Sequence, residues 1–137
     1  MADGIRIHAR IWEEMLRQAR LAPTLECCGL LAGRDGIISE ILPAQNALQS
    51  ATAYEIAPRE LFPLFRHIRE MGLDHLGQYH SHPATENFPS PSDIEQAGYP
   101  DLAYFILSPR VDAVNPIRAF YIRDASVREI EIVPIKD

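Results

Sequence analysis

Residues 80–93 read HSHPATENFPSPSD, and this stretch decides how the rest of the chain is interpreted. His80 and His82 stand two positions apart, and Asp93 follows eleven residues after His82. Two imidazoles and a carboxylate form a three-ligand set for a divalent metal ion. Catalytic zinc sites use three protein ligands and leave the fourth tetrahedral position to water, whereas closed structural sites use four. The sequence offers no obvious fourth ligand nearby, so the pattern favours an enzyme.

The residues around this motif predict firm supports for its side chains. The run Asp74 to Tyr79 is predicted to be a strand that delivers His80 at its carboxyl end. Because side chains two positions apart in a strand point the same way, the imidazoles of His80 and His82 should project together. The run Ser90 to Asp93 has an N-cap serine, a proline at the first helical position and an aspartate three residues after the cap. The alternative is that the histidines are ordinary loop residues and the aspartate only completes a capping box.

The rest of the chain predicts one small domain over residues 1–137, long enough to bury a single core. Apolar residues at helical spacing predict two helices, and apolar runs closed by turn residues predict the strands. The helices are expected at 8–21 and 58–71, and the strands at 5–7, 28–32, 37–42, 74–79, 103–108, 117–123 and 127–133. Pro63 is expected in the first turn of the second helix, where no N–H is needed. The fold class is α/β (α+β), with helices packed on a mixed, mostly antiparallel sheet.

Composition and charge argue against several classes of protein. The net charge of −6 and the pI near 5.3 argue against nucleic-acid binding, which needs a basic surface to neutralise phosphates. No stretch approaches the roughly 20 apolar residues that span a bilayer, and residues 1–11 lack the apolar run of a signal peptide. The adjacent Cys27 and Cys28 cannot form a disulfide framework and are interpreted as reduced thiols. We therefore expect a cytoplasmic protein that binds neither nucleic acid nor membrane.

Residues 80–93 resemble the signature of the JAMM (MPN+) metalloprotease family. That signature reads His-Ser/Thr-His-Pro, six residues, Ser, two residues, Asp, and this chain matches every specified position. The family also has an upstream glutamate, and the segment LECCGLLAG at 25–33 is similar to that region, with Glu26 at the acidic position. The resemblance extends roughly from Ile5 to Val133. It implies the cytidine-deaminase-like JAMM/MPN fold.

The resemblance also implies a role for each site residue. His80, His82 and Asp93 would hold zinc, which lowers the pKa of a water molecule from about 15.7 to about 7. Glu26 would be the general base that takes the proton of this water and passes it to the leaving amine. Ser90 would help to stabilise the oxyanion, and it can also cap a helix, because capping uses the oxygen and leaves the hydroxyl proton free.

Other polar residues are interpreted as structural. Ser81 is expected to make structural hydrogen bonds. A cysteine-protease interpretation of Cys27 or Cys28 is disfavoured, because a metal-bound imidazole has no free lone pair to act as a base. Three further histidines have no partner at ligand spacing and are interpreted as surface or helix-end residues: His8, His67 and His75.

The expected substrate follows from the compact form of the chain. Only the segment Ile94 to Leu102 separates Asp93 from the next strand, whereas family members that cut ubiquitin chains carry longer insertions. The chain is similar in size to bacterial relatives that act on sulfur carrier proteins. We therefore expect a hydrolase acting at the C-terminus of a ubiquitin-like or sulfur carrier protein, whose tail would pair with an exposed edge of the strand ending at His80 or of the strand Cys28 to Ala32.

Two alternatives remain open from the sequence. One is a non-catalytic MPN-type scaffold that binds protein partners, although such relatives usually lack the metal ligands. The other is a general deubiquitinase-like isopeptidase. The sequence does not specify the substrate, the leaving group, the metal or the oligomeric state.

Overall fold

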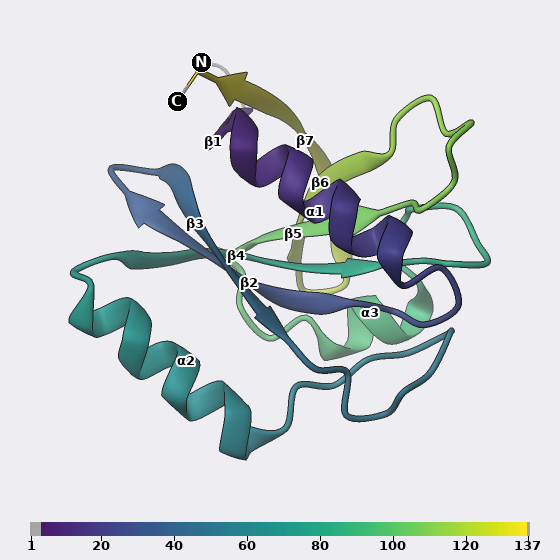
Figure 1. Ribbon diagram of the computed structural model, residues 1–137, viewed down its shortest axis with the longest axis horizontal. Coiled ribbons are helices and arrows are strands. Elements are labelled where there is room, and N and C mark those ends of the chain that lie inside the picture. The colour runs from purple at the N-terminus through teal and green to yellow at the C-terminus, as the bar shows by residue number, and fades with distance from the viewer. Residues whose placement is uncertain (1–3, 137) are drawn as a thin grey trace.

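The computed structural model describes residues 4–136, which form seven strands and three helices (Figure 1). In chain order these elements are β1 (Gly4–His8), α1 (Ala9–Leu21), β2 (Cys28–Arg34), β3 (Ile37–Ala44), α2 (Pro58–Glu70), β4 (Asp74–Ser81), α3 (Pro91–Gln96), β5 (Ala103–Leu107), β6 (Ile117–Arg123) and β7 (Ser126–Ile135). Each predicted helix and strand is present, and the ends differ by only a few residues. None of the three helices has the length and apolar character that crossing a membrane requires.

The strands form a single closed sheet in the order β1-β3-β2-β4-β5-β6-β7, with β7 pairing back onto β1. The pairs β1–β3, β1–β7 and β4–β5 are parallel, and the other four pairs are antiparallel. The predicted mixed, mostly antiparallel sheet with flanking helices is therefore confirmed. Its closure into a barrel was not predicted, because it depends on pairing between the two ends of the chain.

Closure of the sheet contradicts one expectation about the substrate. The strand β2 pairs with β3 on one side and β4 on the other, and β4 pairs with β2 and β5. At the end of β4, Cys28 is the partner of His80 on one side, and the His82 N–H continues the pairing on the other with a bond to the Leu107 carbonyl (2.9 Å). The strands β2 and β4 thus have no free edge for a substrate tail. The expectation that the tail pairs with one of these two strands was wrong.

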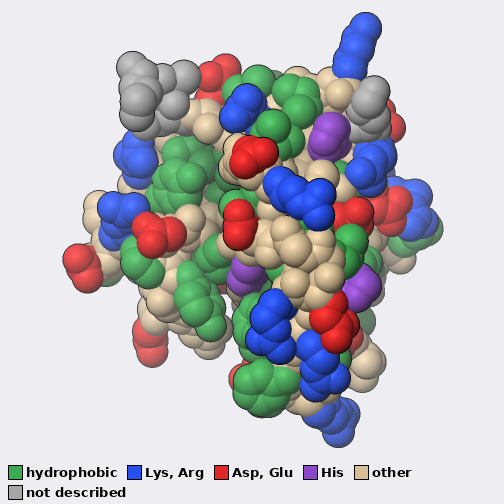
Figure 2. Space-filling model, turned by 90° about the vertical axis from the view of Figure 1, so that its left-hand side faces the viewer, with side chains coloured by type: hydrophobic (Ala, Val, Ile, Leu, Met, Phe, Trp, Pro, Cys, Tyr) green, Lys and Arg blue, Asp and Glu red, His purple; other side chains and the backbone are tan. Residues whose placement is uncertain are grey.

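The helices cover opposite sides of this sheet (Figure 1). The apolar stripe of α1, which includes Ile11 and Met15, is buried against side chains from all seven strands and forms the main core. The helix α2 packs on β2 and β3 through Ile68 and the half-buried Phe65, and α3 lies over β5 and β6. On the face shown in Figure 2, acidic and basic side chains lie close together with apolar side chains between them.

The hairpin between β2 and β3 shows why the local sequence predicts its turn so well. Asp35 and Gly36 both have positive φ, at 54° and 73°. A two-residue type I′ turn requires this backbone at both positions, and Asp-Gly is a preferred pair for it. The turn sets the antiparallel register that brings Cys28, at the start of β2, opposite Ala44.

Two sequence expectations about α2 and β4 were wrong. Pro63 lies inside α2 and not in its first turn, because the helix already begins at Pro58, which takes the first position. His75 is a half-buried residue of β4, where its ring contacts Phe65 and Tyr99 (centroid distances 5.4 and 6.4 Å). Burial therefore lowers the pKa of His75.

Candidate metal centre

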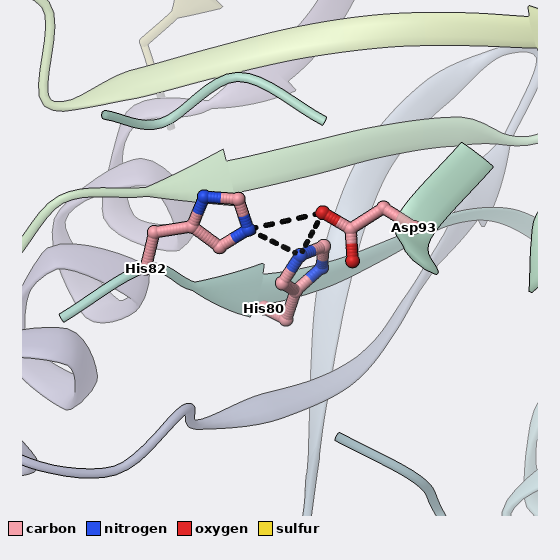
Figure 3. Close-up of side chains that lie close together, drawn as sticks. All are labelled: His80, His82 and Asp93. Carbon is pink, nitrogen blue, oxygen red and sulfur yellow. Dashed lines mark hydrogen bonds and ion pairs between the residues drawn. The ribbon is translucent and has the colours of Figure 1, made fainter. Parts of the chain in front are cut away.

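Three side chains predicted as metal ligands converge at the end of β4 (Figure 3). His80 is the second-last residue of β4, and His82 directly follows the strand. Asp93 lies in the first turn of α3. The Nε2 atoms of His80 and His82 are 3.1 Å apart, and Asp93 Oδ2 lies 3.1 and 3.0 Å from them. Both imidazoles are buried. The structure thus brings together three donor atoms that the sequence separates by up to 13 positions.

The capping box at the start of α3 fixes the direction of the carboxylate. Ser90 Oγ accepts a hydrogen bond from the Asp93 N–H (3.1 Å), and Asp93 Oδ2 accepts one from the Ser90 N–H (2.9 Å). The predicted N-cap is confirmed. The Oδ2 atom that caps the helix is also the atom that faces both imidazoles, so the cap and the candidate metal ligand are one structural unit.

The tautomer of His82 suits metal binding. Its Nδ1 lies 2.8 Å from the carbonyl oxygen of Glu86, so Nδ1 carries the proton and donates it. In the neutral ring, Nε2 is then the nitrogen that carries the lone pair, and this nitrogen faces His80 and Asp93. Hydrogen bonds of this kind from the remote ring nitrogen orient histidine ligands in metalloproteins.

The electrostatics of the three side chains favour a cation between them. Burial alone would raise the pKa of Asp93, but hydrogen bonds from His80 and His82 outweigh it and hold this pKa well below its usual range. Burial lowers the pKa of His80. For His82, burial acts to lower the pKa, but the hydrogen bonds to Asp93 and the Glu86 carbonyl and the nearby carboxylates together outweigh burial and raise the pKa. An ionised carboxylate therefore faces two imidazole nitrogens in a buried site.

Glu26 lies two residues before the start of β2 and is buried, with 3% of its surface exposed. Its carboxyl oxygen Oε1 is buried and has no hydrogen-bond partner in the described part of the chain. Burial raises the pKa of Glu26 to about 7. Glu26 is therefore a buried residue and not a surface carboxylate.

Ser81 holds the segment around Glu26 against β4. Its Oγ accepts a hydrogen bond from the Cys27 N–H (2.9 Å) and donates one to the Leu25 carbonyl (3.5 Å), and its own N–H donates to the Cys27 carbonyl (3.0 Å). Leu25 and Cys27 flank Glu26 in the sequence, and Ser81 lies between the two histidines. The hydrogen bonds of Ser81 therefore hold Glu26 beside the end of β4. The predicted structural role of Ser81 is confirmed.

The donor set fits a divalent metal ion. Two neutral imidazole nitrogens and a carboxylate oxygen are ligands that zinc accepts, and ligand atoms around a tetrahedral zinc lie about 3.3 Å apart. The triangle formed by His80, His82 and Asp93, with edges of 3.0–3.1 Å, is close to that size. The orphaned carboxyl oxygen of Glu26 supplies a buried acceptor for a water molecule at such a centre.

Sequence inspection did not identify Tyr54 as part of this site. Its ring stacks on the imidazole of His80, with centroids 4.5 Å apart and planes 23° from parallel. Its hydroxyl oxygen accepts a hydrogen bond from Gln78 Nε2 (2.9 Å). Both Tyr54 and His80 line a cavity of about 170 Å³ that also reaches Asp93. No local signal marks Tyr54, because it follows a polar loop and meets His80 only through tertiary packing.

The two cysteines do not form a nucleophilic site. Both are free thiols; Cys28 is buried and Cys27 is half-buried. Burial raises the pKa of Cys27 and raises that of Cys28 to about 12, so neither forms a thiolate readily at neutral pH. These properties favour a structural role for both cysteines. The cytoplasmic location expected from the sequence stays a prediction.

Comparison with known families agrees with this geometry. The family described as prokaryotic homologs of the JAB domain matches residues 8–123. The chain belongs to this family. The JAMM/MPN resemblance expected from the HSHP motif and its partners is thereby confirmed.

Two curated relatives of this chain are enzymes by name. The desampylase of Haloferax volcanii is 36% identical over 110 residues, which cover 78% of this chain and 75% of the relative. The CysO-cysteine peptidase of Mycobacterium tuberculosis is 33% identical over 125 residues, which cover 90% of this chain and 86% of the relative.

Solved structures share the fold of this chain. A protein of Desulfitobacterium hafniense has a TM-score of 0.82 at 35% identity, over 96% of this chain and 93% of that chain. A JAB1/MPN domain protein from Archaeoglobus fulgidus has a TM-score of 0.62 at 19% identity, over 94% of this chain and 96% of that chain. The expected JAMM/MPN fold is confirmed.

Proposed function

We propose that this protein is a zinc-dependent hydrolase that cleaves a peptide or isopeptide bond at the C-terminus of a ubiquitin-like or sulfur carrier protein. The observation that carries the proposal is the buried triangle of His80, His82 and Asp93, with Glu26 buried and unpaired beside the same strand end. Three protein ligands leave a coordination position open for chemistry, as in catalytic zinc sites.

The relatives support the substrate class. The mycobacterial relative is named a CysO-cysteine peptidase and the haloarchaeal relative a desampylase, and these names support cleavage of conjugates of ubiquitin-like or sulfur carrier proteins. The short connection at 97–102 between α3 and β5 is in keeping with a compact enzyme. The leaving group, whether a free amino acid or a lysine side chain, is left to experiment.

The residues of the site have distinct roles in the proposed reaction. His80, His82 and Asp93 would hold the metal ion, which supplies Lewis acidity and lowers the pKa of water to about 7. Glu26 accepts the proton of the attacking water and returns it to the leaving amine as the carbon–nitrogen bond breaks. Because Glu26 Oε1 has no partner within the described chain, it is free to take up this proton.

Ser90 is proposed to stabilise the oxyanion. Its oxygen already accepts the N–H of Asp93, so its hydroxyl proton is directed elsewhere and is available as a donor. A hydroxyl donor aimed at the developing negative charge stabilises the transition state more than the ground state.

The proposal is tested by incubating the zinc-loaded protein with a carrier protein whose C-terminal glycine is joined to cysteine. Mass spectrometry then measures the release of carrier and cysteine. The Glu26→Gln variant should lower the rate by at least about 100-fold, since general bases contribute roughly 100- to 10,000-fold. A parallel incubation with a carrier joined to a lysine side chain identifies the leaving group. No release from either substrate, or equal rates for the variant, would exclude this function.

Zinc is tested separately from activity. Purified protein should contain about one zinc ion per chain, as measured by elemental analysis, since the structure offers one three-ligand cluster within its described residues. The His82→Ala variant should contain far less. Full activity after exhaustive chelation, or a different metal in purified native protein, would overturn the assignment of zinc.

A further inference from the structure

The position of Glu26 depends on its backbone, because its own carboxyl oxygen Oε1 makes no hydrogen bond within the described chain. The Glu26 N–H donates to the carbonyl of Ser50 (2.9 Å), and the Glu26 carbonyl accepts from Asn46 Nδ2 (3.1 Å). Both bonds come from one segment, the irregular 45–55 loop between β3 and α2. Whatever holds this loop therefore also holds the base.

Asn46 is the buried centre of the 45–55 loop, with 8% of its surface exposed. Besides the Glu26 carbonyl, its Nδ2 donates to the Ala53 carbonyl (2.9 Å) and lies 3.4 Å from the Ser50 carbonyl. Its Oδ1 accepts from the N–H groups of Leu48 (3.0 Å) and Glu55 (3.3 Å).

These partners determine which way the amide of Asn46 faces. Its nitrogen meets only carbonyl oxygens and its oxygen meets only N–H groups, so the opposite orientation would lose every one of these bonds. A single buried amide thus closes the loop on itself and joins it to the backbone of Glu26. Removing it would leave several buried backbone groups unpaired.

The same loop also reaches the metal ligands. Tyr54, eight positions after Asn46, stacks on the ring of His80 and accepts a hydrogen bond from Gln78 on β4. The 45–55 loop therefore contacts the base on one side and a ligand on the other. If this loop keeps its conformation, it fixes the distance between Glu26 and His80.

We propose that Asn46 is a positioning residue for the reaction, holding the 45–55 loop so that Glu26 stays aligned with the site formed by His80, His82 and Asp93. This inference rests on the proposed function. Catalytic groups need placement to within about 0.5 Å, and a displacement of about 1 Å can lower a rate 100-fold. The effect of losing Asn46 should therefore appear in kcat, while KM and zinc content stay nearly constant.

A kinetic cycle tests whether Asn46 acts through Glu26. The Asn46→Ala variant should lower kcat by about 10-fold or more, and Asn46→Ser, which keeps one donor and acceptor, should lie between it and the wild type. In a Glu26→Gln background the same changes should have little further effect, because the group being positioned is gone. An equal fall in both backgrounds, or a fall in zinc content that accounts for the loss, would overturn the proposal.

Thr52→Ala is the matched control. Thr52 belongs to the same loop but is exposed. Within the described chain its hydroxyl forms one hydrogen bond, with the Ser50 hydroxyl (3.2 Å). This variant should keep the wild-type kcat. A loss equal to that of Asn46→Ala would mean that any change in the loop lowers activity, which contradicts a specific role for Asn46.

Amide hydrogen exchange gives a readout that does not need activity. In Asn46→Ala and Asn46→Ser the Glu26 amide should exchange about 10-fold faster or more, because its acceptor at Ser50 is no longer held, while the amide of Leu30 in β2 should be unchanged. Unchanged exchange at Glu26 would overturn the positioning role even if the protein proved inactive on every carrier substrate. Conversely, faster exchange with no carrier cleavage by the wild type would reject only the proposed reaction.

Discussion

Glu26 combines a buried carboxyl group with an unpaired oxygen, which is unfavourable for folding and useful for proton transfer. Such a residue is expected where function and stability conflict. Removing the charge of Glu26 should therefore stabilise the fold while strongly lowering the rate of the proposed reaction.

Glu26→Gln should stabilise the metal-stripped protein at neutral and alkaline pH. The ordinary pKa of this carboxyl is 4.5, and burial raises its pKa in the fold to about 7. Between these values the folded state keeps a proton that the unfolded state has released, so the free energy of unfolding falls as pH rises through this window. The free energy of unfolding falls by about 3 kcal/mol in total once the pH is above the pKa of Glu26 in the fold.

Urea unfolding of wild type and Glu26→Gln at about pH 4.5 and about pH 8 checks this prediction. The variant should be more stable than the wild type at the higher pH by up to about 3 kcal/mol and nearly equal at the lower pH. Both proteins share the titrations of His80 and His82, so these cancel to a first approximation in the comparison. A stability difference that does not change with pH would contradict the assigned burial effect.

The short helix α3 depends on its first turn. It has six residues, all described and none buried, so little packing holds it. The capping box between Ser90 and Asp93 must supply much of its order, and the same Asp93 oxygen faces the two histidines. The helix cap and the candidate metal site should therefore stabilise each other.

Ser90→Ala should affect both stability and catalysis. Loss of an N-cap costs about 1 kcal/mol, and loss of an oxyanion donor lowers kcat by about 100-fold. Ser90→Thr keeps a hydroxyl that can cap the helix and donate, and should recover most of both. Unfolding curves, zinc content and kcat separate these effects, and a kcat that changes only in proportion to zinc content would reject the oxyanion role.

Pro63 weakens the second turn of α2. Proline has no N–H, so the carbonyl of Arg59 lacks its helical partner, and Pro63 itself is exposed. Pro63→Ala should raise the free energy of unfolding by about 1 kcal/mol or more, since interior proline costs about 3 kcal/mol relative to alanine and part of this is offset by the more flexible unfolded chain.

Pro58→Ala is the matched control for this prediction, because Pro58 occupies the first helical position, where proline is favourable. It should give no increase in stability. Equal stabilisation by both changes in urea unfolding would show that the position within α2 does not matter.

In the whole molecule the site joins three parts of the fold that local sequence does not connect. Glu26 precedes β2, His80 ends β4, and Asp93 begins α3. The closed sheet brings β2 and β4 together, with Cys28 paired to His80. A metal ion held by β4 and α3 should therefore stabilise the entire fold.

Zinc should raise the free energy of unfolding of the metal-stripped protein by mass action. Free zinc at about 100 times its dissociation constant should add about 2.7 kcal/mol, because it binds the folded state preferentially. Thermal unfolding with and without added zinc measures this shift. His82→Ala should show almost no shift, and an equal shift in that variant would place the stabilising metal at another site.

The sequence alone predicts well the local elements and the convergence of His80, His82 and Asp93. Helical and strand spacing, the Asp35-Gly36 turn and the cap at Ser90 act over a few residues, so their signals are complete within short stretches. The HSHP motif and Asp93 are also close in the chain, joined by one loop. These features establish the family and the type of chemistry.

Only the tertiary structure shows which strands are neighbours in the sheet and which residues surround Glu26. Strand alternation reports which face of a strand is buried, but not which strands lie on its two sides, so neither the barrel nor the missing free edges could be predicted. The contacts of Asn46 with Glu26 and of Tyr54 with His80 join residues at least 20 positions apart. Local spacing thus indicates the three candidate metal ligands, whereas the placement of Glu26 depends on long-range packing.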